Sequence, residues 1–191
     1  EGSDVVDLEA IPSEQVTPFV PHDVVCGRFV TAVVSADSRL FAWGPNEEHQ
    51  CGISGVGMVR VLTQVDLPQA VVGAALGEFH GLALAASGEV FAWGMDQGPE
   101  VSMPGGFPGF PERAAMNQPV PRAVEVPQRV AAVHAGGYHS AVVTVEGLLW
   151  TWGSNDDCQL GHGREVPTIF RPKFVDALHS SQRRVTAASL G

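Results

Sequence analysis

The amino-acid sequence predicts an all-β fold: a β-propeller built from tandem, four-stranded antiparallel blades. One pattern, running from a glycine to a Trp-Gly pair, occurs three times without a gap. Glycine (22 residues) and proline (14 residues) divide the 191-residue chain into short segments, which is typical of strands joined by turns. Hydrophobic residues make up 45% of the chain and charged residues 17%, the composition of a folded protein with a core.

The three copies of the pattern run from Cys26 to Gly44, from Leu76 to Gly94 and from Ala135 to Gly153. The spacing between the leading glycine and the tryptophan is the same in each copy, whereas the connecting loops differ in length. A fixed unit with variable connections indicates a repeated structural element. The recurring framework positions are Gly27, Trp43, Gly44, Gly77, Trp93, Gly94, Gly136, Trp152 and Gly153.

Each copy predicts a β-hairpin, because an apolar segment is followed by turn-prone residues and then by a second apolar segment. We expect the outgoing strands at residues 29–35, 79–85 and 138–144. The turns are expected at residues 37–38, 87–88 and 146–147. The return strands start at Leu40, Val90 and Leu149. Further strands are expected at residues 61–65, 120–124 and 129–134, which gives four strands per blade of about 50 residues.

The chain divides into an acidic N-terminal extension, residues 1–22, and a partial propeller, residues 23–191. Repeats start near residues 24, 72 and 131, and a fourth begins at residue 185. The chain opens on Glu1 rather than Met, and three blades alone would leave exposed sheets. We therefore expect a partial chain of a longer protein. No signal peptide and no apolar run of about 18 residues is present, so no membrane span is expected.

Three sequence elements of the third copy resemble the regulator of chromosome condensation repeat. They are Gly-Gly-Tyr-His-Ser at 136–140, Trp-Thr-Trp-Gly-Ser-Asn at 150–155 and Gln-Leu-Gly-His-Gly at 159–163. The first copy keeps Trp-Gly-Pro-Asn at 43–46 and Gln-Cys-Gly at 50–52. The resemblance implies a propeller of seven blades in the full protein, of which about three are present here. It also adds His80, His139 and Gly161 to the repeat framework.

The copies depart from the repeat pattern in two places. The first has Val30 where the others have His80 and His139. The second lacks the Gln-x-Gly element and has instead an insertion rich in proline and glycine, residues 95–118. Loops on a rigid scaffold often bind partners, and exposed Phe and Met can anchor them. The partner-binding residues predicted in this insertion are Met103, Phe107, Phe110 and Met116, although an idle surface loop is the alternative.

The repeated tryptophans and histidines each allow two interpretations. The tryptophans could stack on a ligand, but their fixed place in every copy predicts packing between blades. His80 and His139 could be metal ligands or general bases, but equivalent positions in successive repeats predict a structural hydrogen bond to the backbone. The sequence contains no phosphate-binding glycine motif, nucleophile elbow or Cys-x-x-Cys pair. We therefore predict no catalytic residue, no cofactor and no metal.

Charge and cysteine content limit the classes of partner and compartment. The formal net charge of −10, from 21 acidic and 11 basic residues, disfavours nucleic acid as a ligand. Cys26, Cys51 and Cys158 are too few and too far apart for a disulfide scaffold, which predicts reduced thiols in an intracellular protein. The cytoplasm, nucleus, flagellum and mitochondrion all remain compatible with the sequence.

The first functional hypothesis is a non-enzymatic interaction scaffold that binds protein partners, as a β-propeller subunit or module of a larger assembly. The second is guanine-nucleotide exchange on a Ran-type small GTPase, which the resemblance implies because the founding member of the family has this activity. No residue of this sequence matches that role by motif, since the matching positions are all framework. A third is a propeller module inside a multidomain enzyme such as a ubiquitin ligase.

Overall fold

A computed structural model describes residues 19–55, 57–95, 117–164, 168–179 and 184–190. The described residues form twelve strands in three antiparallel sheets of four. The first sheet contains β1 (Pro21–Cys26), β2 (Thr31–Ser35), β3 (Leu40–Pro45) and β4 (Met58–Gln64). The second contains β5 (Val71–Leu76), β6 (His80–Ala85), β7 (Val90–Met95) and β8 (Asn117–Val124). The third contains β9 (Val130–Ala135), β10 (His139–Thr144), β11 (Leu149–Ser154) and β12 (Thr168–Phe174), and α1 (Asp176–His179) follows it.

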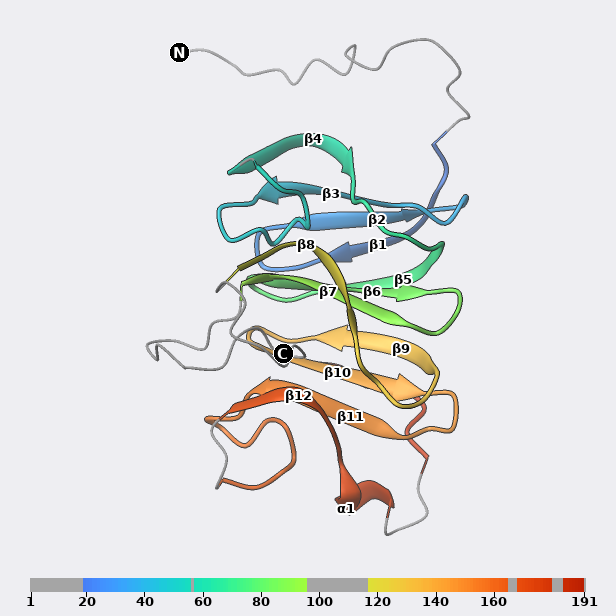
Figure 1. Cartoon of the computed structure of the whole chain (residues 1–191), viewed down its shortest axis with the longest axis vertical. Coiled ribbons are helices and arrows are strands. Elements are labelled where there is room, and N and C mark those ends of the chain that lie inside the picture. The colour runs from blue at the N-terminus through green and yellow to red at the C-terminus, as the bar shows by residue number, and fades with distance from the viewer. Residues whose placement is uncertain (1–18, 56, 96–116, 165–167, 180–183, 191) are drawn as a thin grey trace.

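The sheets are stacked in chain order, like the blades of a propeller (Figure 1). Within each sheet the strands follow one another in sequence order, and every neighbouring pair is antiparallel. Adjacent sheets meet mainly through their first two strands: β5 contacts β1 and β2, and β9 contacts β5 and β6. The all-β prediction with four-stranded antiparallel blades is therefore confirmed for the described residues.

The connections between strands lie on two opposite sides of the stack, where the strands begin and end, and the two sides differ. The β2–β3 turns and their equivalents lie at one end, here called the hairpin end, on the right of Figure 1. The β1–β2 and β3–β4 connections and their equivalents lie at the opposite end, the loop end. The hairpin turns need a left-handed backbone, which Ser38 (φ 63°), Gly88 (φ 89°) and Gly147 (φ 81°) provide.

The outgoing strands start later than the sequence indicates. They begin at Thr31, His80 and His139, because the residues before them form a tight turn at the end of the first strand. In the first blade this turn is closed by a hydrogen bond from Gly27 N to Val30 O (2.9 Å), and the same bond recurs in the other two blades. Apolar residues at 29, 79 and 138 therefore lie in a loop and not in a strand.

Two buried clusters fill the spaces between the three sheets. One joins the first and second sheets and includes Leu40, Ala42, Leu76 and Trp93. The other joins the second and third sheets and includes Leu82, Val90, Val130 and Trp152. Side chains alternate across a strand, so the second sheet contributes one face to each cluster.

The same hydrogen bond marks the start of each later repeat. Val71 N donates to Ser38 O (2.8 Å), and Val130 N donates to Gly88 O (3.0 Å). Val185 N donates in the same way to Gly147 O (3.0 Å). The chain after α1 thus returns to the place from which the next blade would start.

Candidate interaction surface

The loops after β3 and β11 have the same internal structure. In the first blade the Asn46 side chain accepts a bond from Cys51 N (2.9 Å) and donates one to Ile53 O (2.6 Å). Glu48 N donates to the Gln50 side chain (3.0 Å). The buried asparagine thus replaces the missing ladder partners of the loop backbone. We call these segments, residues 46–53 and 155–163, the Gln-x-Gly loops.

The Gln-x-Gly loop of the third blade repeats these bonds. Asn155 accepts from Leu160 N (3.1 Å) and donates to Gly163 O (2.8 Å), and Asp157 N donates to the Gln159 side chain (2.9 Å). No role for these two asparagines was predicted from the sequence. Their signal was present, because each lies three positions after the Trp-Gly tryptophan of its repeat.

The first Gln-x-Gly loop holds the tryptophan of the next blade. Trp93 is fully buried, and its indole N–H donates to Gln50 O (3.0 Å). The Trp93 ring lies so close to Gly52 that a Cβ there would come within 3.0 Å of it. Packing and a satisfied indole N–H together fix this joint between blades.

The other two tryptophans have different surroundings. Trp152 is 1% exposed, within the cluster between the second and third sheets. Trp43 is only half-buried. It packs against the cluster between the first and second sheets, to which Leu40 and Ala42 also belong, and it is more exposed than Trp93 and Trp152.

A histidine and a serine join the second and third blades. His80 Nε2 lies 3.0 Å from Ser140 Oγ, and both side chains are buried. The partner of His80 is therefore a side chain of the neighbouring blade, and not the backbone group that the sequence indicated. Burial, with a smaller contribution from His139, lowers the pKa of His80 to about 4. His139 is also buried, and burial lowers its pKa too.

The distance between His80 and Ser140 would suit a nucleophile and its base, but their setting does not. Ser140 is 1% exposed and His80 8%, so a substrate has no access to the hydroxyl. The first junction has Val30 and Gly81 at the equivalent positions. We conclude that this pair is a structural contact between blades.

Three aromatic side chains at the loop end form what we call the aromatic strip: Phe29, Phe79 and Tyr138, one from each blade. The Phe79 and Tyr138 rings lie 5.8 Å apart, and Phe29 is 52% exposed. Such a strip is the kind of surface that binds protein partners. This strip was not predicted from the sequence, although an aromatic residue precedes the histidine position in all three copies.

Arg28 and Glu78 lie beside the aromatic strip and pair across two blades. The Arg28 guanidinium is 4.9 Å from the centre of the Phe29 ring and forms an ion pair with Glu78. The Glu78 side chain is 12% exposed, whereas that of Arg28 is 57% exposed. Burial and the charge of Glu78 raise the pKa of Tyr138. Glu78 therefore contacts groups of all three blades.

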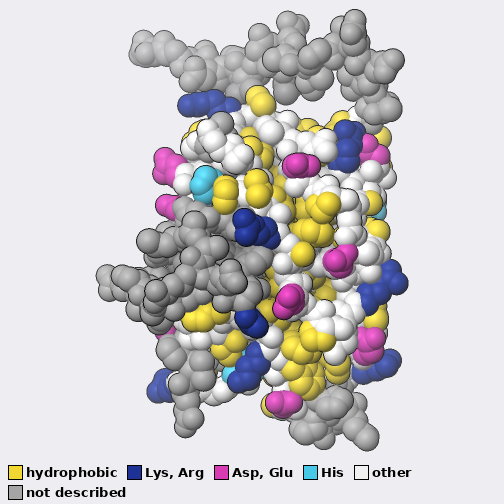
Figure 2. All heavy atoms as spheres, viewed as in Figure 1, with side chains coloured by type: hydrophobic (Ala, Val, Ile, Leu, Met, Phe, Trp, Pro, Cys, Tyr) yellow, Lys and Arg dark blue, Asp and Glu magenta, His cyan; other side chains and the backbone are white. Residues whose placement is uncertain are grey.

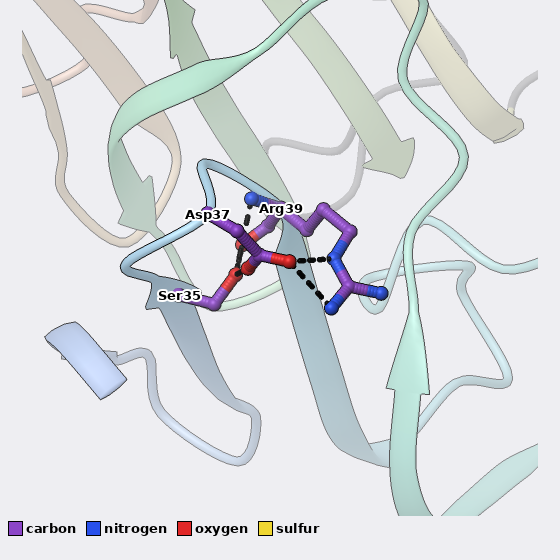
Figure 3. A network of polar contacts seen from close by, with 3 residues as sticks. All are labelled: Ser35, Asp37 and Arg39. Atoms are coloured by element: carbon purple, nitrogen blue, oxygen red, sulfur yellow. Dashed lines mark hydrogen bonds and ion pairs between the residues drawn. The ribbon is translucent and has the colours of Figure 1, made fainter. Parts of the chain in front are cut away.

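The hairpin end has a different type of polar contact, confined to one turn (Figure 3). The Asp37 carboxylate accepts from Ser35 Oγ (2.5 Å) and from Arg39 Nε (2.6 Å). The bond from Ser35, together with Arg39, lowers the pKa of Asp37. These contacts hold the turn in which Ser38 adopts a left-handed backbone without being glycine.

The face formed by the fourth strands has apolar side chains along its middle and charges of both signs among them (Figure 2). The exposed apolar residues of these strands include Met58, Val61 and Leu62 on β4 and Val120 on β8. No single-sign patch is visible in this view. Charge on this face therefore gives no indication of a nucleic-acid site.

The described residues contain neither a metal-binding cluster nor a membrane-spanning helix. No three His, Cys, Asp or Glu side chains in this part of the chain are grouped so that they could hold a metal ion. No helix in the same part is long and apolar enough to cross a membrane. The predicted anchors Met103, Phe107, Phe110 and Met116 lie outside the described residues.

Three stacked, four-stranded antiparallel sheets with inter-blade tryptophans define a β-propeller repeat protein. The chain matches two models of the Regulator of chromosome condensation (RCC1) repeat, at residues 146–191 and 130–159. It belongs to the family of proteins with this repeat. The resemblance found in the sequence is thereby confirmed.

One curated relative is the human E3 ubiquitin-protein ligase HERC2, 32% identical over 173 residues. That match covers 87% of this chain but only 3% of the ligase. Yeast RCC1 (Prp20) bound to Kap60 has a similar fold, with a TM-score of 0.76, 24% identity, and coverage of 90% of this chain and 40% of that one. A second structure of Saccharomyces cerevisiae Prp20p comes from work on its binding to Gsp1p and histones. Its TM-score is 0.73 and its sequence identity 21%, and the match covers 90% of this chain and 42% of that one.

Proposed function

We propose that this chain is a non-enzymatic protein-interaction module, part of a larger propeller that presents its loop end to protein partners. The observation that supports the proposal is the aromatic strip. Phe29, Phe79 and Tyr138 come from three blades and lie at one end, on a frame fixed by inter-blade joints. Phe29 is exposed and the other two rings are partly exposed, and aromatic residues on a rigid frame are common anchors of protein interfaces.

Trp93, Trp152 and His80 contact neighbouring blades, and we assign these framework residues a structural role. The chain spans 3% of the length of HERC2 and 42% of the Prp20p chain. Activities of the whole relatives are therefore attributes of those proteins, and a binding role is what this segment itself supports.

The proposal can be tested with the full-length protein that contains this chain. Affinity capture with quantitative mass spectrometry should retain a stable set of protein partners. We expect Phe29→Ala to reduce their recovery several-fold. Val145→Ala is the matched control, since Val145 is 53% exposed at the hairpin end while Phe29 is 52% exposed at the loop end. Equal recovery from both variants would contradict a partner site on the aromatic strip.

The second candidate function is guanine-nucleotide exchange on a Ran-type GTPase. It is favoured by the similarity to Prp20p, whose structure was solved in work on its binding to Gsp1p. Release of labelled GDP from a Ran-type GTPase distinguishes the two functions. A rate unchanged by the full-length protein supports the interaction module, whereas a large acceleration would replace it with exchange.

A further inference from the structure

The side chains around Arg28 have the composition of a binding site for a guanidinium group. The Phe29 ring lies below the Arg28 guanidinium, and the Glu78 carboxylate faces it from the next blade. An aromatic face with an adjacent carboxylate is how proteins commonly bind arginine, through cation–π attraction and a charge-assisted hydrogen bond. The chain thus shows, with its own residue, which chemical group this surface accepts.

The two charged residues differ in how firmly they are held. Glu78 is 12% exposed, lies at the start of the β5–β6 turn and is tied to the third blade by a bond from its N–H to Gly137 O (3.1 Å). Arg28 is 57% exposed and belongs to the first blade. An exposed, long side chain loses little when it is displaced, and the less exposed carboxylate stays in place to accept another cation.

The third blade completes the carboxylate site. Gly137 has no side chain, and a Cβ there would already lie 3.9 Å from Glu78 Oε2. The Tyr138 side chain forms a hydrogen bond with the Glu78 carboxylate, and its ring is paired with Phe79. A second aromatic side chain therefore lies beside the carboxylate.

We propose that Phe29, Glu78 and Tyr138 form a binding site for an arginine side chain of a protein partner, and that Arg28 occupies this site when no partner is bound. The net charge of −10 favours the approach of such a cationic segment. The inference rests on the proposed interaction function and names the partner chemistry at its strip. An arginine of the partner would displace Arg28 and take its place on Phe29 and Glu78.

The probe for the test is a fluorescein-labelled peptide of alternating arginine and leucine, and its binding to the purified full-length protein that contains this chain is followed by fluorescence anisotropy. Its control is the same peptide with citrulline in place of arginine, which keeps the shape and removes the charge. We expect Phe29→Ala and Glu78→Gln each to weaken binding about tenfold. The unaltered protein should bind the citrulline peptide no more tightly than these two variants bind the arginine peptide.

The sharpest variant is Arg28→Ala, because it should strengthen binding of the arginine peptide by about tenfold if Arg28 competes for the site. Arg39→Ala removes the same charge at the hairpin end and is the matched control, with no change expected. Equal gains in the two variants would reduce the effect to net charge and overturn the proposal. So would equal binding of the citrulline peptide.

Thermal unfolding of each variant checks that the fold is retained. Failure of this inference can be separated from failure of the interaction function. If Phe29→Ala releases partners from the full-length protein but the peptide does not bind, the interaction function stands and the arginine site is wrong.

Discussion

The two junctions between blades are built on the same repeat but use different chemistry. Between the first and second blades, Trp93 packs on a Gln-x-Gly loop, and Val30 and Gly81 occupy the histidine and serine positions. Between the second and third blades, His80 bonds to Ser140. The first junction is thus apolar at the place where the second is polar.

The residue type at a framework position therefore depends on the residue that it contacts in the adjacent blade. Gly81 is required because a Cβ there would overlap the Trp93 ring, whereas the equivalent Ser140 has room and supplies the hydroxyl that His80 needs. A histidine at position 30 would have no side-chain partner at Gly81, and the valine found there needs none. The two residues that meet at each junction are therefore complementary to each other. Substitutions can disrupt such a pair or replace it with the pair of the other junction.

The largest effect is expected for Trp93→Ala. This change removes a fully buried ring and leaves a cavity against Gly52 and the carbonyl of Gln50. Loss of a large buried aromatic side chain costs about 3–5 kcal/mol of the free energy of unfolding. Chemical denaturation should show this loss, with Trp43→Ala as the control. Because Trp43 is half-buried, an equal loss in both variants would contradict the assigned joint.

Acid should weaken the second junction more than the first. An unfolded His80 takes up a proton near its ordinary pKa of 6.5, whereas the folded residue does so only at about 4. The unfolded chain thus binds more protons than the folded chain between these pH values. The contribution of His80 to the free energy of unfolding is therefore fully present above pH 6.5 and is lost as the pH drops toward 4. The expected loss is about 3 kcal/mol, and the lowered pKa of His139 acts in the same direction.

A double variant, His80→Val with Ser140→Gly, copies the pair found at the first junction. It should flatten the dependence of the free energy of unfolding on pH between 6.5 and 4. His22→Val, at an exposed position of β1, is the control and should leave that dependence as it is. An unchanged acid response in the double variant would show that other groups are responsible.

A smaller effect is expected for Gly81→Ala. The added methyl group would overlap the Trp93 ring, so either the ring or the strand must shift. Overpacking of this kind typically costs about 1–3 kcal/mol. Gly73→Ala in β5 is the matched control, because the nearest atom to its Cβ would be 3.9 Å away, an ordinary contact. Denaturation midpoints of the two variants should therefore differ.

Much of the fold could be predicted from the sequence, because spacing alone identifies a repeat. The interval from the leading glycine to the tryptophan gave the hairpins, and the turn residues gave their ends. The predicted starts of the outgoing strands, at residues 29, 79 and 138, come before the observed starts at Thr31, His80 and His139. Phe29, Phe79 and Tyr138 are apolar and suit a strand, but the turn after the first strand leaves them in a loop.

The contacts between blades could not be predicted in this way. Ser140 lies sixty positions after His80, and Glu78 lies fifty after Arg28. Such pairs follow only from how adjacent sheets pack, which local propensity does not contain. The sequence directed attention to the insertion at 95–118, whereas the surface that the described residues support is the aromatic strip.

The smallest effect on stability is expected for Arg28→Ala. Arg28 is largely exposed, and ion pairs of such residues contribute about 0–1 kcal/mol. The pair is polar and partly screened, so any loss in melting temperature should shrink as salt approaches about 1 M. Arg39→Ala, which breaks the pair with Asp37 inside one turn, is the comparison. If Arg28→Ala cost as much as Trp93→Ala, the guanidinium would be a structural element of the junction, and a partner could not displace it without opening the blades.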